Sequence, residues 1–304
     1  MTDGSRRAIV AAFLANLGIA LSKFVAWFFT GAASMLAEAV HSLADTGNQA
    51  LLLFGGARSR RNATPEHPFG YGHERYFWAF VVALVLFSLG SVFAIYEGVV
   101  KLIHPHAIES PQWAIGVLGV AVVLEALSFR TAVREAAKFR GDASWWSYIR
   151  HAKSPELPVV LLEDLGALLG LAFALAGIGL ALATGEPRWD AVGSIAIGLL
   201  LGAIAIVLGA EMKSLLIGEG ASARDLVGIQ AALSGADEIR RVIHLKTLHL
   251  GPEELLVAAK VEFRPDLDLP ALARAIDAAE ARVRERVPAA RLIYLEPDVF
   301  RPQE

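Results

Sequence analysis

The sequence predicts a membrane α-helical protein, in which six transmembrane helices are followed by a small cytoplasmic α+β domain. Of its 304 residues, 55% are hydrophobic and 19% are charged, whereas about a quarter of the residues of an average soluble domain are charged. The hydrophobic residues concentrate in long runs before residue 210, and basic residues gather in alternate connections between these runs. We therefore expect a six-helix transmembrane domain over 1–210 and a cytoplasmic C-terminal domain over 211–304.

Six apolar segments are long enough for one membrane crossing each, which takes about 20 residues. They are residues 7–30, 33–56, 77–101, 111–133, 157–183 and 190–210. A tight turn, Thr30-Gly31-Ala32, joins the first two, and short loops over 104–112 and 184–188 join the next two pairs. These three short connections are expected on one side of the membrane.

Lysine and arginine assign the two sides, because cytoplasmic loops carry an excess of both. The N-terminus, the 57–76 loop and the 130–156 segment carry twelve basic residues, namely Arg6, Arg7, Arg58, Arg60, Arg61, Arg75, Arg130, Arg134, Lys138, Arg140, Arg150 and Lys153. The short connections carry two, Lys101 and Arg188. This difference predicts a multi-pass protein of the cell membrane with both termini in the cytoplasm.

The C-terminal domain has an αββαβ pattern. The predicted elements are a helix over 225–234, strands over 239–250 and 255–263, a helix over 269–287 and a strand over 290–295. Two helices on one face of a small sheet form a stable two-layer design, and the order is ferredoxin-like.

Composition excludes several classes of protein. The net charge of −3 indicates no nucleic-acid partner. Because the chain has no cysteine, disulfides and thiolate metal sites are excluded. No cleavable signal peptide is expected, since the first apolar run is too long and has no cleavage site.

Polar residues in the second segment are the main functional signal. Glu38, His41, Asp45 and Asn48 are spaced i, i+3, i+7 and i+10, which places all four on one helix face. A charge at mid-membrane costs at least ~2.5–3.5 kcal/mol, and a His and an Asp one turn apart can share a metal ion. The alternative is a hydrogen-bonded polar seam between helices.

The fifth segment supplies Glu163 and Asp164. Adjacent residues point about 100° apart on a helix, so we expect one of them to be a metal ligand and the other to pair with a cation or lie near the cytoplasmic mouth. Together with His41 and Asp45, one such carboxylate makes a shell of one imidazole and two carboxylates. This mixture suits zinc, and also manganese or iron.

Three further charged positions lie inside the segments. Lys23 and Glu38 lie at matching depth on neighbouring antiparallel helices, which predicts a structural ion pair; the alternative is that Lys23 snorkels to the surface. Glu97 lies near the outer end of the third segment, and Glu125 is deeper in the fourth. We expect neither Glu97 nor Glu125 to be a ligand.

The second segment and the loop after it carry two specific motifs, LAEAVHSLAD over 36–45 and HPFGYGHE over 67–74. In these motifs the chain closely resembles the cation diffusion facilitator family of divalent-metal transporters, and the six-helix plan with a small tail resembles that family over nearly the whole chain. The resemblance implies a homodimer that exports metal from the cytoplasm, usually in exchange for protons. It implies no permanent cofactor: the cargo is a divalent metal, Zn²⁺ first, with Mn²⁺, Fe²⁺ and Co²⁺ as alternatives.

The resemblance also implies a central site with two ligands from helix two and two from helix five. His41 and Asp45 match the first pair, and Asp164 matches the second position of the other pair. The remaining position falls on Val160, which cannot bind metal. The resemblance therefore leaves Glu163, Asn48 or water as the fourth ligand, with EDLG over 163–166 typical of a divergent branch with an incomplete helix-five motif.

Some family members hold a second metal in the loop after helix two. His67 matches one ligand position there, Tyr71 occupies another, and Glu66 and His73 are near enough to substitute. The alternative is that His67 and His73 only order the turn.

Many members hold metals in the tail, built from several His and Asp. The only histidines of this tail are His244 and His249. They are five residues apart on a strand, so their side chains point to opposite sides. Tyr294 and Glu296 stand where some members place ligands. We therefore interpret the tail as metal-free or weakly binding, with dimer contact as its role by analogy.

The connection over 134–156 combines basic residues with Trp145, Trp146 and Tyr148, which favours an interfacial helix over a plain connector.

Two other functions compete with transport. One is a non-transporting membrane metal sensor or scaffold of the same fold, which the valine at position 160 favours slightly. The other is an intramembrane hydrolase with metal-activated water, but the sequence has no nucleophile motif. We expect a transporter and not an enzyme.

Overall fold

The computed structural model describes residues 3–108 and 111–301, with side chains in the first helix described from residue 16 onward. The side chains of Arg6 and Arg7, which entered the charge count, therefore lie outside the described ones. The chain forms two compact units. One comprises the residues up to Ala57 together with Phe77–Lys213, and the other comprises Arg58–Tyr76 together with the residues from Ser214 onward. The loop over 58–76 thus groups with the C-terminal residues, whereas the sequence-based division had placed it in the membrane domain.

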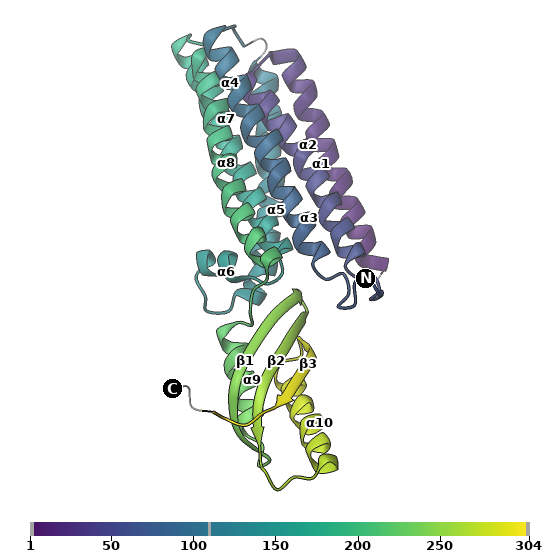
Figure 1. Cartoon of the computed structure of the whole chain (residues 1–304). Helices are drawn as coiled ribbons and strands as arrows, with labels where there is room; N and C mark the ends of the chain where they lie inside the picture. The colour runs from purple at the N-terminus through teal and green to yellow at the C-terminus, as the bar shows by residue number, and fades with distance from the viewer. Residues whose placement is uncertain (1–2, 109–110, 302–304) are drawn as a thin grey trace. The chain divides into compact units, whose positions relative to one another are not determined.

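The first unit is a bundle of long helices running side by side (Figure 1). The helical elements are α1 (Asp3–Thr30), α2 (Ala33–Arg58), α3 (Glu74–Val85), the π-helical η1 (Leu86–Val92), α4 (Phe93–Ile103), α5 (Pro111–Arg140), α6 (Trp145–His151), α7 (Glu156–Thr184) and α8 (Arg188–Ile217). The third apolar segment was expected to be one regular helix. A π-helical stretch interrupts it instead, a feature that often occurs at functional sites in helices.

Four helical segments in the described part of the chain are long and apolar enough to cross a membrane: Glu74–Ile103, Pro111–Arg140, Glu156–Thr184 and Arg188–Ile217. The described apolar stretch of α1, Asn16–Thr30, is shorter. Helix α2 has 26 residues, but its polar stripe lowers its hydropathy. The protein therefore has a helical membrane domain in which four of the six expected crossings are supported by length and composition.

Glycines bring helix backbones into direct contact in the bundle. If Gly198 of α8 carried a side chain, its Cβ would lie 2.8 Å from the carbonyl oxygen of Ser91, which is too close for a real contact. At Gly193, a Cβ would lie 2.9 Å from the carbonyl oxygen of Phe173 in α7. Small residues at helix interfaces in membranes permit this close approach. Helix α8 is therefore fixed tightly against α7 and the η1–α4 segment.

A buried ion pair ties the start of α2 to two other helices. Lys101 of α4 lies 2.9 Å from Asp190 of α8, with side chains 1% and 0% exposed. Asp190 also accepts hydrogen bonds from the backbone N–H of Ala33 (2.8 Å) and from the Ser34 hydroxyl. Lys101 donates to the carbonyl of Gly31 at 3.0 Å. Lys101, which was assigned to a connecting loop from the sequence, is therefore a buried structural residue.

The expected 134–156 connection consists of the end of α5 and the seven-residue α6. Ser144 caps α6 by accepting from the N–H of Ser147 at 3.1 Å. The guanidinium of Arg140 stacks 4.7 Å from the Trp145 ring, and Arg150 pairs with Glu211 at 2.8 Å. Trp145 and Trp146 are exposed.

The C-terminal part of the second unit has the expected αββαβ order. Its elements are α9 (Ala223–Ser234), β1 (Ile239–Gly251), β2 (Glu254–Phe263), α10 (Leu269–Arg286) and β3 (Ala290–Pro297). The sheet order is β1-β2-β3, with β2 antiparallel to β1 and parallel to β3. Leu245 lies opposite Ala259, and Val257 lies opposite Ile293.

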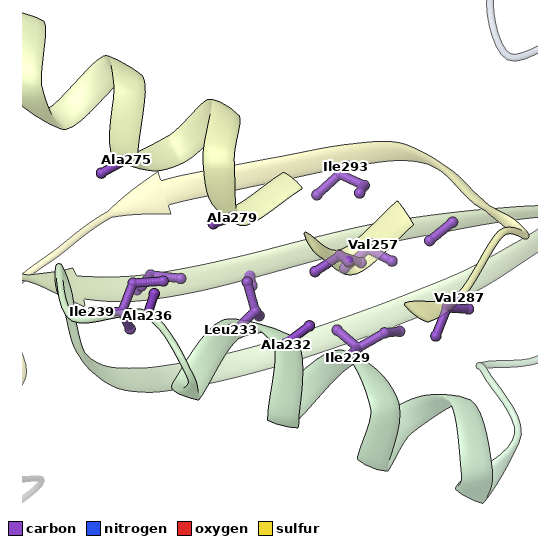
Figure 2. Packing of buried hydrophobic residues seen from close by; sticks show 14 of the residues in the cluster. Ile229, Ala232, Leu233, Ala236, Ile239, Val257, Ala275, Ala279, Val287 and Ile293 are labelled. Atoms are coloured by element: carbon purple, nitrogen blue, oxygen red, sulfur yellow. The ribbon is translucent and has the colours of Figure 1, made fainter. Parts of the chain in front are cut away.

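One hydrophobic core holds this small sheet and its two helices together. Every second residue of β2 is buried, from Leu255 to Phe263. Figure 2 shows Ile229, Leu233 and Ala279 of the helices lying against side chains of the strands. Helices α9 and α10 also contact each other, so both cover the same face of the sheet.

Candidate metal site in the helix bundle

The polar stripe of α2 faces the interior of the bundle. Glu38, His41 and Asn48 are fully buried, and the side chain of Asp45 is 15% exposed. The i, i+3, i+7 and i+10 spacing turns all four to one side of the helix.

His41 is the least satisfied polar side chain of the stripe. Its Nδ1 lies 3.5 Å from Oδ1 of Asp45, beyond ordinary hydrogen-bond length. Among the described residues, neither ring nitrogen of His41 has a hydrogen-bond partner. Leaving a buried polar group unpaired costs free energy, so its retention here favours a role in binding over a role in packing.

A cavity of about 10 Å³ lies next to Asp45. Its lining residues come from α1, α2, α5 and α7 and are Asn16, Ile19, Ser42, Asp45, Gln49, Glu125, Val160, Glu163 and Asp164. Four carboxylates from three helices thus surround a space that accommodates one small species. Oxygen ligands of this kind suit a divalent cation.

Two of these carboxylates have neutral hydrogen-bond donors. The amide of Asn48 donates to Glu163 at 2.7 Å, and the hydroxyl of Ser128 donates to Asp164 at 2.9 Å. We expected one of Glu163 and Asp164 to be a metal ligand and the other to pair with a cation or lie near the cytoplasmic mouth. Both line the cavity instead, because α2 and α5 contact α7 from two sides and each receives one of the adjacent side chains.

Lys23 lies at hydrogen-bond distance from Glu38, as their matching depths predict. Its Nζ is 3.0 Å from Oε2 of Glu38 and 2.6 Å from the hydroxyl of Ser42, and both charged side chains are fully buried. A Cβ on Gly170 of α7 would lie 2.4 Å from Oε1 of Glu38. This geometry makes Glu38 a structural partner of α1 and α7.

The proposed ligands are not gathered into one metal-binding group. Within the described part of the chain, no three His, Asp or Glu side chains are close enough to hold a metal ion together. His41 contacts Asp45 but does not line the cavity, and Val160 forms part of the cavity wall. Side-chain movement of His41 and the carboxylates would therefore be needed to complete a coordination shell.

Glu125 is the cavity residue that the sequence reasoning missed. It was expected to be a helix contact at most, yet it lines the cavity with Asp45, Glu163 and Asp164. The sequence offered one signal: Glu125 and Ser128 are polar residues spaced i, i+3 in an apolar segment, which places them on one helix face.

The candidate loop ligands are separated. Glu66 and His67 are exposed, and the His67 ring packs on Tyr71 at 4.6 Å. His73 is half-buried and packs on Tyr76 at 5.9 Å. This burial lowers the pKa of the His73 imidazole below its ordinary value.

The two tail histidines also face different surroundings. His244 is exposed and His249 is buried, with Nδ1 of His249 lying 3.3 Å from the carbonyl oxygen of Gly251. Glu296 pairs with Lys260 at 3.1 Å, and Tyr294 is exposed.

The helical membrane domain, the acidic cavity in its bundle and the small C-terminal α+β domain are together typical of a class, that of polytopic cation transporters. Comparison with known proteins gives the family. A family model described as the cation efflux transmembrane domain matches residues 9–217, more than half of the chain. The chain therefore belongs to the cation diffusion facilitator family of metal transporters, whose members are not enzymes.

Three relatives match most of the chain. It is 34% identical over 263 residues to the mitochondrial proton-coupled zinc antiporter SLC30A9 of Xenopus laevis, covering 86% of this chain and 47% of that protein. It is 32% identical to metal tolerance protein C4 of Arabidopsis thaliana, covering 85% of this chain and 57% of that one. It is 25% identical to the magnetosome protein MamB of a Magnetospira strain, covering 90% of each. The chain thus spans about half the length of the first two relatives.

Proposed function

We propose that this protein exports Zn²⁺ from the cytoplasm in exchange for protons, with Mn²⁺, Fe²⁺ and Co²⁺ as alternative cargo. The observation that carries this proposal is the position of His41. Among the described residues its ring nitrogens have no hydrogen-bond partner, and it lies beside Asp45, which lines the acidic cavity between α2, α5 and α7. The printed name of the Xenopus relative, a proton-coupled zinc antiporter, supports both the ion and the coupling.

The proposed ligands are His41, Asp45 and Asp164, with Glu163, Asn48 or water completing the shell. Each carboxylate must give up its present hydrogen-bond donor or share it with the metal, because Asn48 and Ser128 now hold Glu163 and Asp164. Imidazole and carboxylates bind metal only when deprotonated, so metal binding releases protons. Proton return from the other side of the membrane would then expel the metal.

The membrane arrangement is part of the same proposal. Six helices span the cell membrane, both termini face the cytoplasm, and the tail, a ferredoxin-like domain, contributes to a homodimer. The charge distribution of the connecting loops supports this orientation. A second metal held by His67 with Glu66 or His73 would require the imidazole rings to leave their aromatic partners, Tyr71 for His67 and Tyr76 for His73.

Metal binding to the purified full-length protein tests the site. Titration calorimetry with Zn²⁺ in buffers of different ionisation enthalpy measures both the affinity and the protons released per metal. We expect His41→Ala and Asp164→Ala each to weaken binding by about tenfold or more. A His41→Ala protein with unchanged affinity for Zn²⁺ would refute the role of His41.

A second measurement separates transport from sensing. Tight binding of Zn²⁺ by protein that moves no metal into vesicles would favour the sensor or scaffold function.

A further inference from the structure

A second, larger cleft lies outside the membrane helices, within the unit formed by the 58–76 loop and the tail. Its volume is about 560 Å³. The loop residues over 59–63 and 68–75 form one wall, and the other wall consists of residues 250–255 with Arg291 and Leu292. The cleft therefore lies where the loop meets the β1–β2 turn and the start of β3.

The two walls are packed closely where they join. A Cβ on Gly72 would lie 2.2 Å from the carbonyl oxygen of Leu250, and one on Gly251 would lie 3.1 Å from the Cα of Gly72. Gly70 adopts a φ of 82°, a conformation that favours glycine. Backbone thus lies directly against backbone, which gives the cleft a defined floor.

Positive charge dominates the lining. Four arginines, Arg60, Arg61, Arg75 and Arg291, face two glutamates. The pairs between these groups are long: Arg75 to Glu253 is 4.0 Å and Arg291 to Glu254 is 3.6 Å. Two glutamates offset two of the four arginine charges at most, so the lining keeps a net positive charge.

Two of the arginines have no acidic partner at all in the described structure. Arg60 and Arg61 form no ion pair there, and the guanidinium of Arg61 stacks 4.8 Å from the Tyr71 ring centre. Stacking orients a guanidinium while leaving its N–H donors available. Arginine donors of this geometry bind phosphate oxygens in a bidentate manner.

We propose that this cleft binds a phosphate-bearing anion through Arg60 and Arg61 on the loop and Arg291 on the tail. Its volume falls within the range of small-molecule sites. The bound anion would bridge the loop and the tail, because each wall supplies at least one of the arginines. This inference does not depend on the proposed cargo of the bundle.

The position of the loop in the chain indicates two sources for such an anion. Arg58 ends α2 and Glu74 begins α3, so Arg60 and Arg61 lie two and three residues beyond a membrane helix. Basic residues at this depth meet the phosphates of anionic lipids. A soluble phosphate compound would meet the same guanidinium groups.

Binding to the full-length protein in detergent tests the proposal in two arms. In the first arm, native mass spectrometry measures retention of phosphatidic acid, with phosphatidylcholine as the zwitterionic comparison. In the second arm, calorimetry measures the affinity for inorganic pyrophosphate. The variants are Arg60→Gln/Arg61→Gln for the loop wall and Arg291→Gln for the tail wall. Arg240→Gln/Arg274→Gln is the control, because it removes the same charge from exposed positions outside the cleft.

We expect at least one of the two anions to bind, with an affinity that falls about tenfold or more in each cleft variant and stays unchanged in the control. Retention of phosphatidic acid alone identifies a lipid headgroup, and binding of pyrophosphate alone identifies a soluble ligand. Absence of binding in both arms would overturn the proposal. Equal losses in the cleft and control variants would also overturn it, since they would reflect net charge. A loss in the loop variant without one in Arg291→Gln would contradict the two-walled site.

Discussion

At the residue scale, Val160 and Glu125 line the same cavity of the helix bundle. Val160 lies one helical turn before Asp164 on α7 and contributes only methyl groups to the wall. Glu125 reaches the same space from α5. We infer that Glu125 compensates for Val160, because its carboxylate offers this space an oxygen that the valine side chain does not.

Replacement of Glu125 by Gln tests this compensation. We expect the KM for Zn²⁺ transport to rise about 10-fold to 100-fold, because the neutral amide is a weaker metal ligand than the carboxylate. Zinc uptake by reconstituted vesicles measures the change, with Glu97→Gln as a matched control, since Glu97 does not line the cavity. Adding Val160→Asp to Glu125→Gln should recover part of the lost affinity. An unchanged KM in Glu125→Gln would exclude the compensation.

The sequence predicted the common face of the polar residues of α2, but not which residues of the other helices lie next to them. Helical spacing alone places Glu38, His41, Asp45 and Asn48 on one face, and equal depth brings Lys23 to Glu38. By contrast, the hydrogen bond from the Asn48 amide to the Glu163 carboxylate joins residues that lie 115 positions apart in the chain. Such a contact depends on how the helices rotate against each other, which no local pattern specifies.

At the scale of elements, Asp190 and Lys101 fix the beginning of the helix that carries His41 and Asp45. The Asp190 carboxylate caps α2 from another helix by accepting from the N–H of Ala33, and a negative group there also interacts favourably with the helix dipole. The sequence indicated a tight turn before Ala33 but not this partner, which lies 157 positions away.

Removing the charge of Asp190 should therefore destabilise the bundle. We expect Asp190→Asn to lower the free energy of unfolding by about 3–5 kcal/mol, because it leaves Lys101 buried and unpaired. Thermal unfolding in detergent measures this loss. Glu186→Gln is the control, since its pair with Arg188 is exposed at 3.9 Å and should contribute about 1 kcal/mol or less. Equal stability of Asp190→Asn and the wild type would contradict the capping role.

The contact between α7 and α8 gives a second prediction for the elements. Gly193→Leu should separate the two helices, because even its Cβ would lie 2.9 Å from the Phe173 carbonyl oxygen. Asp164 lies on α7, so we expect both lower stability and weaker Zn²⁺ binding. Gly179→Leu is the control, since a Cβ there meets nothing within 4 Å. If the two variants behave alike, close packing at Gly193 is not required.

At the scale of the whole molecule, the chain combines two units that are stabilised by different kinds of interaction. The bundle depends on helix packing and buried polar pairs, whereas the tail has a conventional hydrophobic core. Composition predicted this division and the αββαβ order of the tail, because alternation and turn residues are local signals. It could not predict that the loop over 58–76 groups with the tail, since that depends on backbone contacts such as Gly72 with Leu250.

A mutation in the tail core should act mainly on that unit. Leu233 is fully buried between α9, α10 and the sheet, so Leu233→Ala should cost about 2–5 kcal/mol. Hydrogen exchange of the full-length protein should show faster exchange in α9 and β1–β3 and unchanged protection in α7 and α8. Faster exchange throughout the bundle would show that the two units unfold together.

Zinc flux in proteoliposomes tests the central claim most directly. The protein is reconstituted with an interior zinc dye and a fixed pH gradient, and wild type is compared with Asp45→Asn and Glu97→Gln. The account predicts proton-driven Zn²⁺ uptake by wild type and Glu97→Gln and a loss of uptake in Asp45→Asn. Uptake by Asp45→Asn at the wild-type rate would contradict the assignment of the transport site to the α2 stripe and its cavity.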